Sequence, residues 1–242
     1  MNLIIDVGNS FVKVAVYSKA KLLKKKVITH SSLIDTVDEF LKKHKSIERS
    51  IISSVGSILK KDQTQLKKRL NTLVLNNSTK LPFKNNYKTP KTLGVDRIAL
   101  VSASVKFYSD RNVLIIDAGT CITYDFITDE NQYLGGAISP GIRTRYKSLN
   151  NLTANLPLLE TKAPKNIIGR STEESIHSGV VNGIISEIDG VIDTYKSRYE
   201  DLTVILTGGD AKFLSKRLKN SIFANSNFLL DGLNYILEFN SN

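Results

Sequence analysis

One short pattern occurs twice in this sequence, and it limits the folds that the chain can adopt. The first copy, Leu3 to Tyr17, is an apolar run that ends in Asp6, a glycine-containing turn and a second apolar stretch. The second copy, Val113 to Ile127, has the same order, with Asp117 at the end of its apolar run. A repeat of strand, aspartate, tight turn and strand predicts two structurally similar halves.

Strand and helix signals alternate around the two copies, which is typical of an α/β fold. In the first half they predict strands at Leu22–Ile28, Arg49–Ser54 and Leu73–Leu75, helices from Ser31 or Ser32 to Lys43, at Ile58–Leu70 and at Val95–Phe107, and a polar loop at Asn76–Lys91. In the second half they predict strands at Gln132–Ile138, Thr203–Thr207 and Asn227–Leu230, a helix from Ile142, a long helix capped by Ser171 and a C-terminal helix capped by Asp231. Gly179 and Gly183, four residues apart on the long helix, are expected to permit the close approach of another helix.

The bulk composition excludes several classes of protein. The 242 residues include 41% hydrophobic residues, and no apolar run has the length of a transmembrane helix. The start at Met1 has no basic leader, so we expect no signal peptide. A single cysteine, Cys121, cannot form an internal disulfide, which fits a cytoplasmic location, and we expect it to pack as a small apolar residue. The three histidines do not have the spacing of a zinc site.

The formal net charge of +11 leaves two interpretations open. It could reflect a general basic bias, or it could serve an anionic partner such as a nucleic acid or a membrane surface. The densest basic stretch, Lys19 to Lys26, reads as a hairpin and has no interleaved aromatic residues, so we expect neither nucleic acid nor membrane as a partner.

The first turn has the composition of a phosphate-binding loop. Gly8 lets backbone N–H groups approach a phosphate, and Asn9 and Ser10 add side-chain donors. Asp6 could hold Mg²⁺ through water, and Lys13 could reach a phosphate as a point charge. The alternative is an ordinary hairpin turn.

Two such hairpins in similar halves can bracket a triphosphate, which is the arrangement shared by actin, hexokinase and the Hsp70 ATPase domain. A late Thr207-Gly208-Gly209-Asp210 turn is similar to the one that runs beside the adenosine in that superfamily. We therefore expect an α/β fold with two ribonuclease H-like domains of the actin/hexokinase type, each a mixed sheet flanked by helices, around a central cleft. The expected domains are residues 1–110 and 111–242, with the last helix able to pack back on the first half.

A further set of motifs over almost the whole chain resembles the type III pantothenate kinases. They are Tyr87-Lys88-Thr89-Pro90, Leu93-Gly94-Val95-Asp96-Arg97, Asp117-Ala118-Gly119-Thr120, Gly135 to Gly141, Leu156-Pro157, Thr172-Glu173, Thr207 to Ala211 and Asp231-Gly232-Leu233. The Gly-Val-Asp-Arg and Gly-Gly-Ala-Ile-Ser-Pro-Gly segments are the specific ones, since the hairpins alone would fit any member of the superfamily.

The resemblance implies an activity and a role for each matching residue. The activity is ATP-dependent phosphorylation of pantothenate to 4'-phosphopantothenate, the first step of coenzyme A biosynthesis. Asp96 matches the general base, and an aspartate is normally ionised at pH 7 and can accept a proton. The ATP-binding positions are Asp6, Val7, Gly8, Asn9, Ser10, Phe11, Val12, Lys13 and Thr120; the substrate-binding positions are Tyr87, Gly94, Val95, Asp96, Arg97 and Thr172. Arg97 suits a carboxylate because a guanidinium can bind it through two hydrogen bonds.

The resemblance also implies ions and a partner. Asp117 matches the position that holds a monovalent cation, K⁺ or NH₄⁺, and the alternative is that it orients a Mg²⁺-bound water. The family acts as a homodimer, with some substrate contacts made across the interface. Two other functions stay open at this point: another small-molecule kinase of the same superfamily, and a basic regulatory protein that binds nucleic acid. The helix after Pro140, with Arg143 and Arg145, is more basic than is usual in the family.

Overall fold

The computed structural model describes residues 1–54 and 60–241, which form two compact units. Unit 1 comprises Met1–Ser109, Asn131–Tyr133 and Asn227–Asn242, and unit 2 comprises Asp110–Glu130 and Leu134–Ser226. The first long segment thus ends next to the division expected at residue 110, and the C-terminal segment belongs to unit 1.

Unit 1 is built on a five-stranded mixed sheet of order β3-β2-β1-β4-β5. Neighbours β1/β2 and β2/β3 are antiparallel, whereas β1/β4 and β4/β5 are parallel. Its elements are β1 (Asn2–Val7), β2 (Val12–Ser18), β3 (Lys21–Ile28), α1 (Leu33–Lys43), β4 (Arg49–Ser54), α2 (Lys60–Arg69), β5 (Asn71–Val74), β6 (Lys84–Asn85), α3 (Val95–Phe107) and α7 (Phe228–Phe239), with short 3₁₀ turns at His30–Ser32 and Pro90–Thr92.

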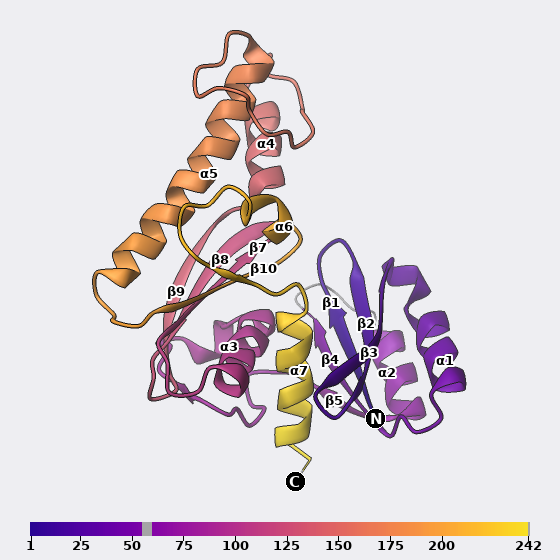
Figure 1. Cartoon of the computed structure of the whole chain (residues 1–242). Helices are drawn as coiled ribbons and strands as arrows, with labels where there is room; N and C mark the ends of the chain where they lie inside the picture. The colour runs from indigo at the N-terminus through magenta and orange to yellow at the C-terminus, as the bar shows by residue number, and fades with distance from the viewer. Residues whose placement is uncertain (55–59, 242) are drawn as a thin grey trace. The chain divides into compact units, whose positions relative to one another are not determined.

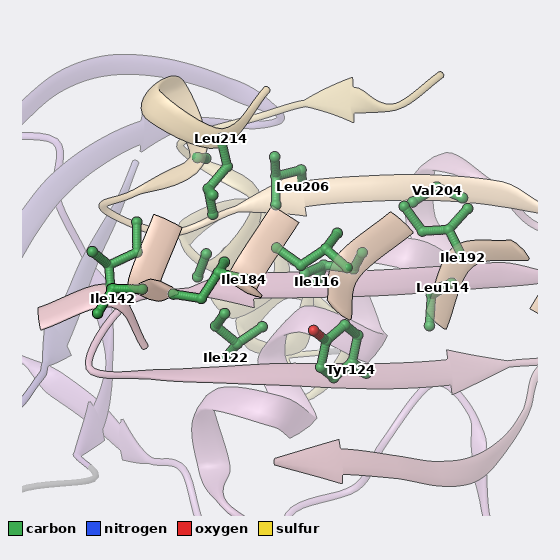
Figure 2. Packing of buried hydrophobic residues seen from close by; sticks show 14 of the residues in the cluster. Leu114, Ile116, Ile122, Tyr124, Ile142, Ile184, Ile192, Val204, Leu206 and Leu214 are labelled. Carbon is green, nitrogen blue, oxygen red and sulfur yellow. The ribbon is translucent and has the colours of Figure 1, made fainter. Parts of the chain in front are cut away.

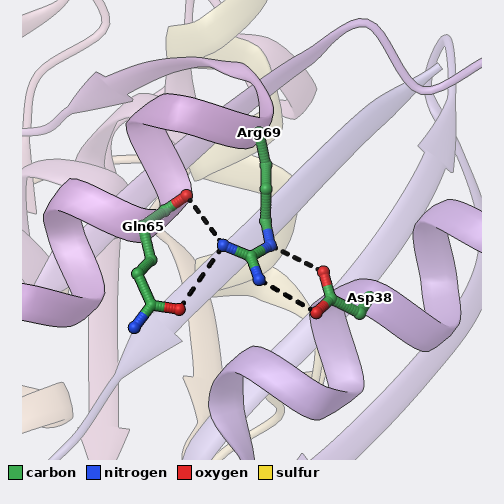
Figure 3. Close-up of polar contacts among 3 residues, drawn as sticks. All are labelled: Asp38, Gln65 and Arg69. Carbon is green, nitrogen blue, oxygen red and sulfur yellow. Dashed lines mark hydrogen bonds and ion pairs between the residues drawn. The ribbon is translucent and has the colours of Figure 1, made fainter.

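Helices α1 and α2 cover one face of this sheet. Leu33, Val37 and Phe40 of α1 and Leu66 of α2 pack with the alternate strand residues that point to that face, among them Ile5 and Ile52. At the surface, the guanidinium of Arg69 donates to both carboxylate oxygens of Asp38 over 2.6 and 3.0 Å and also bonds to Gln65, which joins α2 to α1 (Figure 3). This ion pair lowers the pKa of Asp38.

Helix α7 packs against α3 and against strands β1 and β4 of the same sheet (Figure 1). The Asn234 side chain is fully buried, where its oxygen accepts from Asn2 Nδ2 over 2.8 Å and its nitrogen donates to the Lys19 carbonyl over 2.9 Å. Gly232 lies so close to α3 that a Cβ there would be 1.9 Å from the Ala99 carbonyl oxygen. These contacts fix the last helix on the first strand of the chain.

The expected strand at Asn227–Leu230 is wrong, because Asn227 is the N-cap of α7 and the strand of this region is β11 (Phe223–Ala224). The apolar residues Phe228 to Leu230 continue with Leu233 and Ile236 at helical spacing, so they belong to one buried helix face. Asp231 does not cap the helix; it lies in its first turn, where it accepts a hydrogen bond of 2.7 Å from the Tyr17 hydroxyl.

Unit 2 holds the main part of a six-stranded mixed sheet of order β11-β10-β7-β8-β9-β6. Figure 2 shows its core, in which residues of β7, β8 and β10, such as Ile116, Ile122 and Leu206, pack against Ile184 and Ile192 of α5. Its elements are β7 (Val113–Ala118), β8 (Cys121–Ile127), β9 (Gln132–Pro140), α4 (Ile142–Asn151), α5 (Thr172–Lys196), β10 (Thr203–Thr207), α6 (Ala211–Leu214) and β11. Ser171 caps α5 as expected, because its side chain accepts from the Glu174 N–H.

Several local expectations differ from the structure. The region Asn76–Lys91 contains the short strand β6 and the start of a 3₁₀ turn. A Cβ at Gly179 would meet no atom within 4 Å and one at Gly183 only the Arg145 guanidinium at 4.0 Å, so these glycines do not permit a close helix contact within the described residues. Cys121 is exposed because it starts β8 beside the turn. The expected helix start at Ile58 lies outside the described residues.

In the described part of the chain, no helix is both long enough and apolar enough to span a bilayer.

The Asn2–Asn234 pair predicts a measurable loss of stability. Asn234→Leu would leave the buried Asn2 amide and the Lys19 carbonyl without their partner, and each such group costs about 1–3 kcal/mol. We expect urea denaturation followed by circular dichroism to give a lower free energy of unfolding. The double variant Asn2→Leu/Asn234→Leu should lose less than the sum of the two single variants. Additive losses, or no loss at all, would contradict the role of this pair.

Candidate active site

The first repeated hairpin presents its backbone at the end of β1. The Gly8 N–H donates to the Phe11 carbonyl over 3.0 Å, which closes a turn whose residues Asn9, Ser10 and Phe11 are exposed. Below the turn, Asp6 and Lys13 are register partners on β1 and β2, and Lys13 Nζ lies 3.3 Å from Asp6 Oδ2. The hairpin therefore combines a solvent-exposed turn with one lysine ammonium group and one carboxylate.

His30 supports this turn from the 3₁₀ segment after β3. Its Nε2 lies 2.9 Å from the Gly8 carbonyl oxygen, a hydrogen bond in which the ring nitrogen donates. This contact was not predicted from the sequence, in which the histidines were considered only as metal ligands. No pattern in the sequence places His30 beside a residue 22 positions earlier.

The Asp6 carboxyl is buried, with 5% of the residue exposed. Burial raises the pKa of Asp6 above its ordinary value, the positive charge of Lys13 opposes that rise, and the negative charge of Asp96 adds to it. The rise shows that Lys13 does not fully offset the loss of hydration, so the charged form of Asp6 is disfavoured in the folded chain. Because the charge of Asp96 acts on Asp6, these two aspartates lie in one region of unit 1.

The start of α3 places Asp96 and Arg97. Gly94 is the N-cap, and Asp96 Oδ1 accepts from the Arg97 N–H over 2.8 Å. A Cβ at Gly94 would lie 2.4 Å from the same oxygen, so glycine leaves room for this carboxylate. A negative side chain in the first turn of a helix is also favoured by the helix dipole.

Arg97 is buried against an aromatic pair. Only 5% of the residue is exposed, and its guanidinium carbon lies 5.5 Å from the centre of the Tyr87 ring. Tyr87 in turn stacks on Tyr133 at 6.0 Å. The expected substrate residues Tyr87, Gly94, Asp96 and Arg97 are thus gathered in unit 1, at the N-terminus of α3.

The second hairpin, in unit 2, is held by the first turn of α4. The Thr120 carbonyl accepts from the Gly141 N–H over 3.0 Å and from the Thr144 hydroxyl over 2.6 Å. A Cβ at Gly141 would lie 1.9 Å from the Gly119 oxygen, which explains the glycine that ends the Gly-Gly-Ala-Ile-Ser-Pro-Gly segment. The positive charge of Arg145 is balanced nearby, because its guanidinium pairs with Glu187 and also donates to the Pro140 carbonyl.

The late glycine turn contacts the second hairpin directly. Gly208 has a φ of +95°, and a Cβ there would lie 2.2 Å from the Ala118 oxygen and 2.4 Å from Asp117 Oδ1. The Asp210 N–H donates to the same Ala118 carbonyl over 3.0 Å. Asp117, Thr120 and the Gly208–Asp210 turn therefore form one backbone-rich region at the ends of β7 and β10.

Thr172 lies elsewhere in unit 2. It is the exposed first residue of α5 and lines a groove of about 960 Å³ together with Arg145, Arg170 and Leu156. Within the described residues no group of three or more histidine, cysteine or acidic side chains has the geometry of a metal site.

The chain matches proteins of known name over nearly its full length. A profile of the type III pantothenate kinase family matches residues 2–194. The type III pantothenate kinase of Christiangramia forsetii is 55% identical over 240 residues, which cover 99% of each chain. That of Flavobacterium johnsoniae is 47% identical, covering 99% of this chain and 98% of the relative. The chain belongs to the type III pantothenate kinase family. It is therefore a kinase, which transfers a phosphoryl group and for which ATP is the expected donor.

Solved structures agree with this family at the level of the fold. A Campylobacter jejuni protein described as a Baf family transcriptional activator has a TM-score of 0.64 at 23% identity and 98% coverage of both chains. A glucokinase from an Antarctic psychrotroph has a TM-score of 0.54 at 12% identity, again with 98% coverage of both. The mixed sheets flanked by helices thus confirm the expected actin/hexokinase-type class of this kinase.

Two adjacent glycines give a matched test of the second hairpin. Gly208→Ala forces a Cβ onto Ala118 and Asp117 in a left-handed conformation, so we expect a lower melting temperature and weaker nucleotide binding. Gly209→Ala is the control, because a Cβ there meets no atom of the described residues within 4 Å. Thermal unfolding and calorimetric titration with ADP measure both effects. Two variants with equal properties would show that the close approach of Gly208 is unimportant.

The raised pKa of Asp6 predicts how the stability of this kinase depends on pH. A carboxyl group whose pKa is raised in the folded protein stabilises the fold when it is protonated. This contribution to the free energy of unfolding is fully present below the ordinary aspartate pKa and is lost as the pH rises through the raised pKa of the folded state. At pH 7 the charged Asp6 therefore disfavours the nucleotide-free fold. We expect Asp6→Asn to raise the melting temperature at pH 7. The rise should be smaller at acidic pH, where Asp6 of the wild type is protonated, and the variant should bind Mg²⁺-ADP more weakly. A lower melting temperature at pH 7 would mean that the ion pair with Lys13 outweighs burial.

Proposed function

We propose that this kinase phosphorylates the primary hydroxyl of pantothenate with ATP and forms 4'-phosphopantothenate, which is the first step of coenzyme A biosynthesis. The observation that carries the proposal is the arrangement at the start of α3. There the buried Arg97 rests on Tyr87, and Asp96 is near enough to the hairpin to raise the pKa of Asp6. The residues proposed as base, as carboxylate-binding cation and as phosphate turn belong to the same unit, which supports the proposal.

Asp96 is the proposed general base. Phosphoryl transfer depends mainly on positioning and charge neutralisation, so the base needs only to take the hydroxyl proton as the phosphoryl group arrives. The hydrogen bond from the Arg97 N–H fixes one oxygen of Asp96 and sets the direction of the other. Removal of such a base typically slows a reaction by about 10²–10⁴-fold.

Arg97 is the proposed partner of the pantothenate carboxylate. Its guanidinium is held by Tyr87 before any substrate binds, which lowers the entropy lost on forming two parallel hydrogen bonds. Gly94 and Val95 would contribute the backbone at the helix start, and Thr172 would contribute a hydroxyl from the groove in unit 2.

The two hairpins are the proposed ATP-binding elements. Residues 7–12 form the proposed phosphate turn, in which the exposed residues 9–11 would offer backbone N–H groups. Lys13 would offer a charge, and Thr120 would contribute from the second hairpin. Asp6 suits a Mg²⁺ ion through water, because its Oδ1 has no hydrogen bond within the described residues and carboxylate oxygens are the ligands that Mg²⁺ prefers. When bound, Mg²⁺ would neutralise phosphate charge.

Asp117 is the proposed ligand of a monovalent cation, K⁺ or NH₄⁺. A triphosphate with one Mg²⁺ keeps a net negative charge, and another carboxylate at the same phosphates is easier to explain if a cation lies beside it. The competing role, orientation of a water on Mg²⁺, would make the reaction insensitive to the monovalent salt. Replacement of K⁺ by Na⁺ at fixed ionic strength separates the two.

A homodimer in the cytoplasm is part of the proposal. The exposed Leu134 and Ile138 of β9, and the open space over Gly179 and Gly190 of α5, support an association surface on unit 2. The groove that contains Thr172 includes Gly179, so a second copy on this surface could complete a substrate site. The single, exposed Cys121 is in keeping with a reducing compartment.

A coupled assay with ATP, Mg²⁺, K⁺ and pantothenate tests the function, and Asp96→Asn tests the base. We expect the wild-type chain to form ADP only when pantothenate is present and the variant to lose about 10²–10⁴-fold in kcat. ADP affinity of the variant, measured by calorimetry, should change little.

Asp35→Asn is the matched control, since Asp35 is an exposed aspartate in the first turn of α1. It should turn over like the wild type. Near-normal turnover of Asp96→Asn would show that Asp96 is not the base. A wild-type chain that phosphorylates another alcohol but not pantothenate would show that pantothenate is not the substrate.

A further inference from the structure

Ser53 stands in a row of three polar residues that crosses the sheet of unit 1. Asp6 on β1 is the register partner of Lys13 on β2 and of Ser53 on β4. Side chains at paired positions of neighbouring strands point to the same face of a sheet. Asn2 is four residues before Asp6 on β1 and therefore points to the same face. Asn2 bonds to Asn234 of α7, so this is the face that α7 covers. Ser53 thus flanks Asp6 on the side opposite Lys13.

The Ser53 hydroxyl is fully buried and has no hydrogen-bond partner among the residues that the structure describes. The other deeply buried serines differ in this respect. Ser50, on the same strand, bonds to the Thr72 hydroxyl over 2.8 Å, and Ser102, Ser104 and Ser178 each donate to a backbone carbonyl. A buried hydroxyl without a partner lowers stability, and alanine would fill the same place without that cost. The hydroxyl at Ser53 therefore needs an explanation other than packing.

The neighbouring carboxylate indicates what the partner is. Asp6 uses Oδ2 for Lys13, and within the described residues its Oδ1 makes no hydrogen bond. Mg²⁺ keeps most of its water ligands when it binds to proteins, so a hydrated Mg²⁺ at Asp6 would bring water O–H groups next to Ser53. A serine hydroxyl can accept one hydrogen bond and donate another, which matches a site between a carboxylate and a bound water.

We propose that Ser53 is a positioning residue of the metal–nucleotide site, whose hydroxyl holds a water of the hydrated divalent cation beside Asp6. The inference rests on the proposed function, since it takes Asp6 as the carboxylate that faces the metal. It assigns Ser53 no contact with the nucleotide itself and no role in proton transfer. The hydroxyl is then unpartnered only while the metal is absent.

Metal binding in the presence of ADP tests this directly. We use Mn²⁺, which substitutes for Mg²⁺ and is visible by electron paramagnetic resonance, and measure its affinity for the full chain with saturating ADP. Ser53→Ala should weaken Mn²⁺ binding by about 3- to 10-fold, the effect of one lost hydrogen bond. Its affinity for ADP without metal should be unchanged, and its melting temperature without ligands should be equal to or higher than that of the wild type.

Ser50→Ala is the matched control, because it removes a buried hydroxyl from the same strand that already has a partner. It should lower the melting temperature and leave Mn²⁺ affinity unchanged. Unchanged Mn²⁺ affinity in Ser53→Ala, a lower melting temperature, or weaker binding of metal-free ADP would each overturn the proposal. The pantothenate assay is separate: a wild-type chain that binds Mn²⁺ with the expected dependence on Ser53 but does not phosphorylate pantothenate would overturn only the proposed function.

Discussion

The buried carboxylate of Asp6 is the constraint on which the rest of unit 1 depends. It ends the central strand of the sheet, and the protein lowers the cost of its charge only in part, with one lysine on the next strand. A second aspartate in the same region makes that charge harder to keep. Under the proposed function, cations bound at the phosphate turn would stabilise this charge, because opposite charges nearby stabilise ionised carboxylates. Binding and folding would then place opposite demands on Asp6.

In both hairpins a carbonyl of the turn is held by hydrogen bonds, but different residues donate them. In unit 1 the turn carbonyl at Gly8 is held by an imidazole, whereas in unit 2 the Thr120 carbonyl is held by a backbone N–H and a hydroxyl from the start of a helix. Each set of contacts fixes a carbonyl of its turn. The similarity of the halves lies in backbone geometry, and the supporting side chains have no common pattern.

The sequence predicted the parts of the fold in which local pattern and tertiary structure agree. The repeat, the strand at Arg49–Ser54 and the helix at Val95–Phe107 were confirmed because apolar spacing and turn residues define them locally. The segment at Asn227–Leu230 was wrong because three adjacent apolar residues fit a strand or a buried helix equally well. Candidate site residues could be named where motifs are contiguous, as at Gly94 to Arg97, and their roles stay predictions. The positions of His30 and Ser53 near the first hairpin could not be predicted, since they depend on residues of another strand or loop that are distant in the sequence.

The return of α7 to the first strand has a consequence for how the chain is made. A ribosome releases β1 to β5 early, but the helix that covers β1 and β4 on one face comes from the last residues to be synthesised. Until then the buried side of the sheet, with Asn2 and Ile4, is open to water and to other nascent chains. Unit 2 is encoded between the first and the last segments of unit 1, so its folding during translation shortens the effective loop that α7 must close. The order of synthesis thus favours completion of the second unit before the first.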